Sequence, residues 1–95
     1  MPFFVIYAKD KADSKQARAT SMDAHRAYLT GIIDTIRTAG VLLDEAGVSV
    51  GSMFVIEAPD KASVEAVVAR EPFVTQGVFE SVEVHAFRWA MGAPV

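Results

Sequence analysis

The sequence has 95 residues, of which 52% are hydrophobic, with no cysteine and a formal net charge of −3. This length predicts one domain over residues 1–95 with a modest core. The lack of cysteine excludes disulfides, thiolate catalysis and cysteine-ligated zinc, and the acidic balance argues against a nucleic-acid partner. The apolar runs fall far short of the roughly 20 residues that span a bilayer, and no basic segment precedes the first of them. We therefore expect a cytoplasmic protein without membrane contact.

Residues 3–8 form an aromatic and β-branched run, which predicts a buried strand. Alternation would divide its side chains between two faces, Phe3, Val5 and Tyr7 on one and Phe4, Ile6 and Ala8 on the other. Residues 9–19 are polar and lack apolar periodicity, so we expect a mobile loop. The loop carries a basic cluster interrupted by two carboxylates: Lys9, Lys11, Lys15 and Arg18, with Asp10 and Asp13. We interpret this cluster as solvated rather than as a polyanion site.

A helix is expected to follow this loop. Thr20 as N-cap with Asp23 three residues later predicts its start. Gly40 is the expected C-cap, after a last helical residue near position 39. His25 falls between Met22 and Leu29 at helical spacing, so it lies on the buried apolar stripe.

Two strands, residues 41–46 and 48–58, are predicted next, joined through Gly47 as an antiparallel hairpin. Gly51 inside the second strand indicates a bulge or the close approach of another backbone. Asp60 is the expected N-cap of a helix over residues 61–70, which Pro72 ends. A short turn closed by Gly77 leads to a last strand, residues 79–89.

The order β-α-β-β-α-β predicts an α+β, ferredoxin-like fold with a four-stranded antiparallel sheet and both helices on one face. The last strand has apolar side chains on both faces: Val82, Val84 and Ala86 on one, Phe87 and Trp89 with Glu83 and His85 on the other. Because the second face also needs a cover, we expect a homodimer packed sheet against sheet. His85 would then have a structural role at the interface.

Six segments together resemble the YciI-like (YCII-related domain) family. They are residues 3–10 (FFVIYAKD), 24–29 (AHRAYL), 51–58 (GSMFVIEA), 71–73 (EPF), 77–80 (GVFE) and 87–89 (FRW). The resemblance implies a dimeric α+β barrel fold and a site that pairs a histidine of the first helix with an aspartate directly before a proline. It also implies relatives that include a dehydrochlorinase acting on a chlorinated hydroxymuconate.

His25 matches the histidine of that site, whereas Glu71 stands where the family has aspartate. Glutamate is a poorer helix N-cap than aspartate, because its longer arm folds back less well onto the first turn. We therefore expect a changed geometry at this position.

A carboxylate beside an imidazole fixes the ring tautomer, and imidazole exchanges protons near neutrality. A His25–Glu71 pair can thus remove a proton next to a carbonyl or assist the loss of a halide without a cofactor. The predicted function is a cofactor-free lyase or isomerase acting on a small organic acid, with His25 and Glu71 catalytic. Its candidate substrate-binding residues are Tyr7, Tyr28 and Ser52.

Two other functions stay open. One is a non-catalytic dimeric module that binds a small metabolite or a protein. A structure with His25 far from Glu71, or sealed from any cavity, would favour it. The other is a cofactor-free monooxygenase of the same superfamily, which needs an electron-rich aromatic substrate. Neither a metal-site spacing nor a glycine-rich nucleotide motif is found, so we expect no metal and no cofactor.

Overall fold

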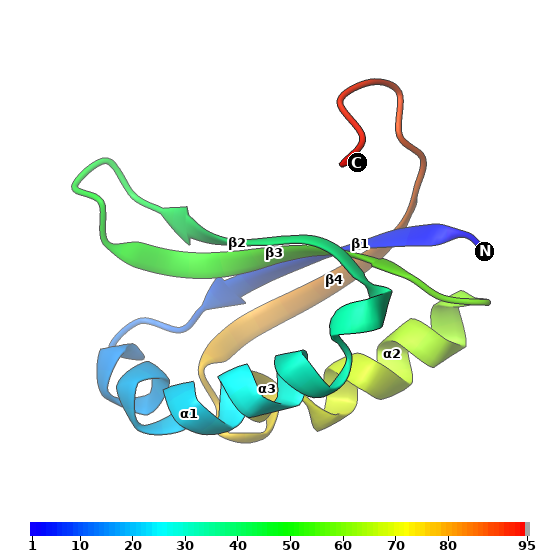
Figure 1. Cartoon of the computed structure of the whole chain (residues 1–95). Helices are drawn as coiled ribbons and strands as arrows, with labels where there is room; N and C mark the ends of the chain where they lie inside the picture. Colours follow the sequence, from blue (N-terminus) through cyan, green and yellow to red (C-terminus); the bar gives the residue numbers. More distant parts are fainter. Residues whose placement is uncertain (95) are drawn as a thin grey trace.

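The computed structural model describes residues 1–94 and has two layers, a sheet and a set of helices that covers one of its faces (Figure 1). The elements in chain order are β1 (Phe3–Asp10), α1 (Lys15–Gly31), the 3₁₀ helix η1 (Ile33–Thr35), β2 (Ile36–Leu43), β3 (Ser49–Glu57), α2 (Lys61–Arg70), α3 (Pro72–Thr75) and β4 (Phe79–Phe87). This is the predicted ferredoxin-like βαββαβ order, with α3 as an added single turn. Within residues 1–94, no helix is both long and apolar enough to cross a membrane.

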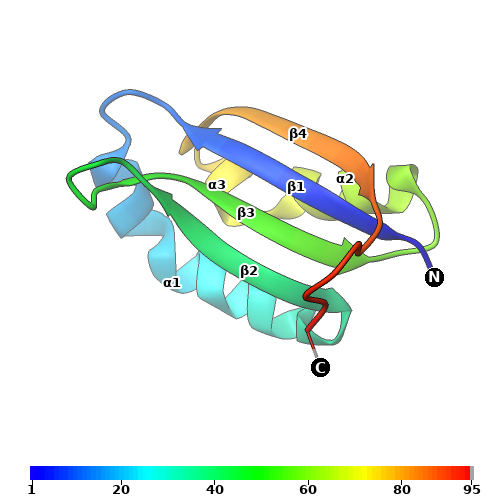
Figure 2. The same ribbon diagram turned by 90° about the horizontal axis from the view of Figure 1, so that it is seen from above.

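The sheet has the strand order β2-β3-β1-β4, and every neighbouring pair is antiparallel (Figure 2). The alternation predicted for β1 is confirmed, because Phe4, Ile6 and Ala8 are buried whereas Tyr7 is 46% exposed. The buried side of β1 and β3 packs on α1 and α2 around a core of Phe4, Ile6, Phe54, Ile56, Ala58 and Val64. The helices thus cover one face of the sheet only.

Helix α1 begins at Lys15, with Ser14 as its N-cap residue, and not at Thr20. The expected mobile loop over residues 9–19 is therefore wrong. The buried residues of α1 are polar, namely Arg18, Ser21 and His25. A helix whose buried face is polar shows no apolar periodicity, which is why the pattern hid its first turns.

Helix α1 also ends earlier than predicted. It stops at Gly31, and β2 already begins at Ile36, so the predicted helix to residue 39 and strand over residues 41–46 are wrong. β2 is an edge strand with no fully buried residue. Its partly buried positions are Ile36, Thr38 and Leu42, and because one of them is polar and Gly40 interrupts the series, the apolar alternation of a strand is weak in its sequence. It ends at Leu43 because the Asp44 carboxylate accepts hydrogen bonds from the amides of Ala46 and Val48 and closes the turn.

The second half of the chain follows the prediction closely. The Asp60 carboxylate accepts a hydrogen bond from the Ser63 amide, 2.8 Å, and caps α2. Gly77 has the positive φ of 74° that the turn before β4 requires. The predicted close approach at Gly51 is confirmed, since a Cβ there would overlap the Ala8 carbonyl oxygen.

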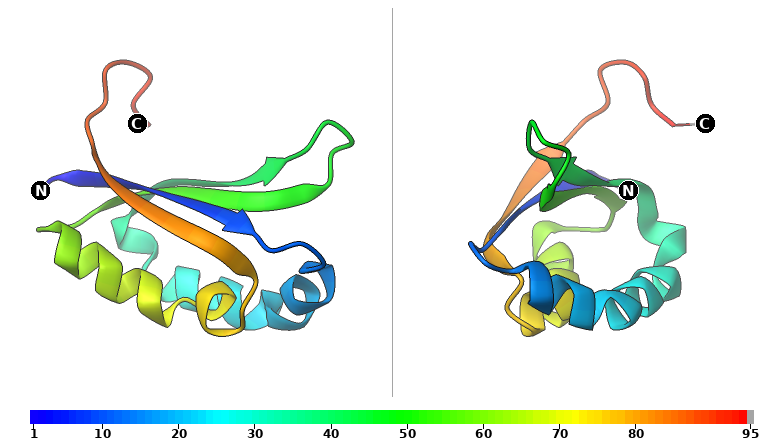
Figure 3. Two further views of the ribbon diagram at one scale, coloured as in Figure 1. Left: turned by 180° about the vertical axis from the view of Figure 1, so that it is seen from behind. Right: turned by 90° about the vertical axis from the view of Figure 1, so that its left-hand side faces the viewer.

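The chain after β4 leaves the sheet on the face opposite the helices (Figures 1 and 3). The last strand ends at Phe87 rather than Trp89. The Trp89 ring instead packs edge-on against Phe87, at 4.8 Å between ring centroids, and against Phe3, at 6.0 Å. This aromatic cluster covers one end of the open sheet face.

Candidate functional site: a buried histidine–glutamate pair

The site lies where α1 meets the junction of α2 and α3. His25 projects from α1 and Glu71 is the single residue between α2 and α3. His25 Nδ1 is in direct hydrogen-bond contact with Glu71 Oε1, although the residues are 46 positions apart in the chain. Both residues are buried, with exposures of 8% for His25 and 5% for Glu71. The structure thus brings together the two residues that the resemblance pairs.

Glu71 divides its carboxylate between two partners. While Oε1 contacts the imidazole, Oε2 accepts a hydrogen bond from the Phe73 amide at 3.2 Å. Pro72 supplies the first helical position of α3, where no donor is needed. Glu71 is therefore the N-cap of α3, although glutamate is a poorer capping residue than aspartate. One carboxylate caps the helix and holds His25, and the expected change in geometry relative to an aspartate stays a prediction.

Phe73 fixes the plane of the imidazole. Its ring is fully buried and stacks on His25 at 3.7 Å between centroids, with only 1° between the planes. Phe79 in turn packs edge-on against Phe73 at 5.8 Å. The imidazole is thus held at one edge by Glu71 and over one face by Phe73, which leaves it little freedom to rotate.

The second ring nitrogen of His25 is available for chemistry. With Nδ1 facing a carboxylate, the neutral ring carries its proton on Nδ1 and its lone pair on Nε2. Nε2 has no hydrogen-bond partner. Among residues 1–94 every fully buried side-chain nitrogen or oxygen does have one, so Nε2 is not fully buried and reaches solvent. His25 also lines a cleft of about 250 Å³.

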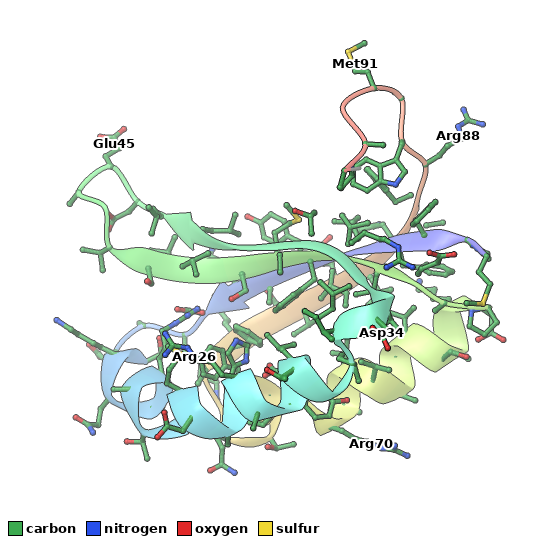
Figure 4. The ribbon with its side chains drawn as sticks, viewed as in Figure 1. Arg26, Asp34, Glu45, Arg70, Arg88 and Met91 are labelled. Atoms are coloured by element: carbon green, nitrogen blue, oxygen red, sulfur yellow. The ribbon has the colours of Figure 1, made fainter. Side chains whose placement is uncertain are left out.

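The cleft lies between α1 and the β2–β3 half of the sheet. Its lining residues are Arg18, Met22, His25, Arg26, Leu29, Ala39, Gly40, Val41, Ser52 and Phe54. Figure 4 shows how the side chains of α1 and of the sheet fill the space between the two layers. The walls are largely apolar, and the polar groups come from α1 and from Ser52. The His25 side chain is therefore neither far from Glu71 nor sealed from a cavity, the two conditions that would have favoured a non-catalytic module.

Arg18 is the site residue that the sequence pattern missed. It was expected on a solvated loop but lies on α1, 8% exposed, and forms two 3.0 Å hydrogen bonds to the Asp10 carboxylate. Its Nη2 also lies 3.3 Å from the Gly51 carbonyl and 3.4 Å from Ser52 Oγ. One signal was present in the sequence: Arg18 precedes His25 by seven residues, which is two helical turns on the same face.

The three candidate substrate-binding residues do not lie together. Ser52 is buried and lines the cleft. Tyr28 is half-buried, and its hydroxyl donates a 2.7 Å hydrogen bond to the Val67 carbonyl, which joins α1 to α2. The pKa of the Tyr28 hydroxyl is raised, mainly by burial and also by the charge of Glu71, while the charge of Arg70 opposes the rise. Tyr7 lies on the open sheet face, away from His25.

The second histidine lies outside this site. His85 is on β4, where its Nε2 is 2.9 Å from Glu83 Oε1, and both side chains are more than half exposed. Among the described residues there is no group of three or more histidine, aspartate or glutamate side chains placed to hold a metal ion. The two histidine–glutamate pairs thus differ in environment: His25–Glu71 is buried beside a cleft, whereas His85–Glu83 is exposed to solvent.

Comparison with known proteins identifies the family. The family model for the YCII-related domain matches residues 2–88. The chain belongs to the YCII-related domain family. Protein YciI of Escherichia coli O6:H1 is 34% identical over 93 residues, covering 90% of this chain and 95% of the relative, and Protein YciI of Shigella flexneri gives the same values. The resemblance stated from the sequence is confirmed.

Solved structures of related proteins share the fold. The 5-chloro-2-hydroxyhydroquinone dehydrochlorinase of Burkholderia phenoliruptrix, in complex with 2,5-dihydroxybenzoquinone, is 32% identical with a TM-score of 0.82, and 95% of each chain is covered. This dehydrochlorinase is named for a chlorinated hydroxyhydroquinone, not for the chlorinated hydroxymuconate that the resemblance implied. Protein Atu4242 of Agrobacterium tumefaciens is 12% identical with a TM-score of 0.58, over 100% of this chain and 99% of that one, and shares the fold alone. The predicted fold class is confirmed.

Proposed function

We propose that this YCII-family protein is a cofactor-free lyase or isomerase that moves a proton on a small organic acid. The observation that carries the proposal is the orientation of His25. Its Nδ1 faces the buried Glu71 carboxylate, its Nε2 has no partner in residues 1–94, and the residue lines the cleft. An imidazole held in this way presents an unprotonated nitrogen to a bound substrate and is stabilised by the carboxylate once it is protonated.

The proposed step balances without an oxidant or reductant. His25 Nε2 takes a proton from the substrate, and the electron pair of the broken bond forms a new double bond. In a chlorinated hydroxyhydroquinone, a hydroxyl proton taken by His25 is returned to the chlorine-bearing ring carbon, which gives the keto tautomer. Removal of a second hydroxyl proton then forms a second carbonyl, and chloride leaves from the chlorine-bearing carbon with its electron pair, so that a hydroxyquinone, chloride and one proton are produced. Glu71 accepts from Nδ1 and holds the imidazolium until the proton is passed on to the ring carbon or to water. Proton transfer by a positioned side chain of this kind contributes about 100- to 10,000-fold to a rate.

The size and lining of the cleft favour a compound with a single ring. A cavity of about 150 Å³ lined by apolar side chains holds benzene, so a cleft of about 250 Å³ accommodates a ring with polar substituents. Phe54, Leu29 and Val41 supply apolar walls, and Ser52 supplies a hydroxyl. The related dehydrochlorinase acts on a chlorinated hydroxyhydroquinone, and we propose that this chain takes an acidic hydroxylated ring of the same kind.

The test is chloride release from 5-chloro-2-hydroxyhydroquinone, measured for the unaltered protein and for His25→Gln. We expect release by the unaltered protein and a loss of about 100-fold or more in the variant. His85→Gln is the matched control, because it also removes a histidine paired with a glutamate, but at an exposed position. Equal rates for unaltered protein and His25→Gln, or no release by the unaltered protein, would overturn the proposal.

We also propose that two copies pack through the open sheet face. That face carries the Phe3, Phe87 and Trp89 cluster and the exposed Tyr7, and the helices lie on the other side. Apolar side chains on an uncovered sheet face favour association, and an antiparallel sheet packs well against its own copy. Sedimentation at micromolar concentration should give the mass of a dimer. A monomer mass there would contradict this assembly.

A further inference from the structure

Arg18 is a buried charge whose partners occupy only part of its guanidinium. Nε and Nη2 bind the Asp10 carboxylate, and Nη2 also meets the Gly51 carbonyl and Ser52 Oγ. A guanidinium has five N–H donors, two of them on Nη1. In residues 1–94 no side chain or backbone group binds Nη1. Every fully buried polar side-chain atom there has a partner, so Nη1 is not fully buried and reaches solvent. Two donors of a fixed guanidinium are therefore free.

Arg18 lines the same space as His25, the 250 Å³ cleft. Both also lie against the Phe73 ring, with the guanidinium carbon 4.8 Å and the imidazole centroid 3.7 Å from its centre. The two groups are thus separated by no more than the sum of those distances, which one aromatic ring with its substituents can span.

We propose that Arg18 binds a negatively charged oxygen of the substrate, a carboxylate or an ionised ring hydroxyl, while His25 takes the proton. This inference rests on the proposed function and adds a substrate class, organic anions, and a second recognition group. Ser52 Oγ, which also lines the cleft and lies 3.4 Å from Nη2, is placed to donate to the same oxygen. The Asp10 carboxylate holds the guanidinium in a fixed orientation, so less side-chain entropy is lost when an anion binds.

The surroundings of Arg18 favour the approach of an anion. Arg18 also lines a groove formed by the end of β1, the start of α1, the segment between them and residues 47–50. The charged residues of this groove are Lys9, Lys11, Lys15 and Arg18 against Asp10 and Asp13, so cations outnumber carboxylates. In a protein with a net charge of −3 this is a local positive field, and such fields concentrate anions.

The test is a binding titration with benzoate and with benzamide, its neutral analogue of the same shape, followed by NMR of the His25 imidazole. The unaltered protein should prefer benzoate. The double variant Asp10→Asn/Arg18→Gln removes both members of the ion pair, so no charge is left buried without its partner. It should weaken benzoate binding by about 10- to 100-fold and leave benzamide binding unchanged. Arg18→Lys keeps the charge but not the planar donors, so its affinity for benzoate should lie between those of the unaltered protein and the double variant.

Arg70→Gln is the control for net charge, since it removes an arginine that points away from the sheet on α2 (Figure 4). Equal affinity for benzoate and benzamide in the unaltered protein would overturn the inference. Unchanged benzoate affinity in the double variant would do the same, as would loss of benzoate binding in Arg26→Gln instead. The titration reports anion binding and the chloride assay reports proton transfer. An anion preference that does not depend on Arg18 ends this inference alone, whereas chloride release that does not depend on His25 ends the proposed function alone.

Discussion

Glu71→Gln offers a test of the site that needs no substrate. The glutamate carboxylate accepts from two donors at once, the Phe73 amide and the imidazole N–H at Nδ1 of His25. A glutamine amide has one oxygen and one NH₂ group, so it cannot accept from both. The backbone amide of Phe73 cannot reverse its polarity, whereas a neutral imidazole can change tautomer. The amide oxygen will therefore keep the Phe73 contact and turn NH₂ toward Nδ1.

The expected result is a shift of the imidazole proton from Nδ1 to Nε2. In that tautomer Nε2, the ring nitrogen without a protein partner, carries a hydrogen and no longer acts as a base. Because the hydrogen bonds are kept but lose their charge assistance, the free energy of unfolding should fall by only about 1–3 kcal/mol. The variant remains folded, and its chemistry alone is altered.

Nitrogen-15 NMR of the histidine rings measures the tautomer directly. His85 provides an internal control in the same spectrum, because its glutamate partner is unchanged. We expect a proton on Nδ1 of His25 in the unaltered protein and on Nε2 in Glu71→Gln. The tautomer of His85 should be the same in both proteins. An unaltered protein with its proton on Nε2, or a variant with the same tautomer as the unaltered protein, would refute this expectation.

Two predictions concern the scaffold and are checked by urea unfolding. Gly51→Ala places a methyl group against the Ala8 carbonyl oxygen between β1 and β3 and should cost about 1–3 kcal/mol. Gly40→Ala, which meets nothing within 4 Å, should cost less than half of that; equal losses would contradict the close-approach argument. Tyr28→Phe removes the hydrogen bond to the Val67 carbonyl and should cost about 1 kcal/mol near neutral pH. The raised pKa of Tyr28 means that its stabilisation is complete below the ordinary value of 10.0 and is lost as pH rises through the raised value. Stability should therefore fall less between about pH 8 and about pH 11 in Tyr28→Phe than in the unaltered protein, and equal declines would exclude Tyr28 as the group responsible.

The sequence predicted those parts of the fold in which local chemistry and burial agree. Asp60 caps α2 as expected, Gly51 lies at a close backbone approach, and β1 alternates as its residues indicate. The cap and the alternation depend on residues close together in the sequence, and a glycine inside a strand itself indicates a close approach, although its partner Ala8 lies on another strand.

The errors lie in α1 and β2, and the first has the same origin as the site. The buried face of α1 carries Arg18, Ser21 and His25, which an apolar periodicity cannot register. The capping pattern of Thr20 and Asp23 therefore predicts a start inside the observed helix, which places Arg18 in a loop. The contact between His25 and Glu71 depends on packing between elements 46 residues apart, so the residues alone could not supply it and only the family resemblance suggested it. The role of Glu71 as a combined cap and partner follows from the geometry of α3 and not from any propensity.

The most direct test of the central claim, that His25 transfers a proton in the cleft beside Glu71, is the rate of chloride release in the hydroxyhydroquinone assay for His25→Gln relative to His85→Gln. We expect a loss of about 100- to 10,000-fold in the first variant and an unchanged rate in the second. Equal rates in the two variants would contradict the claim.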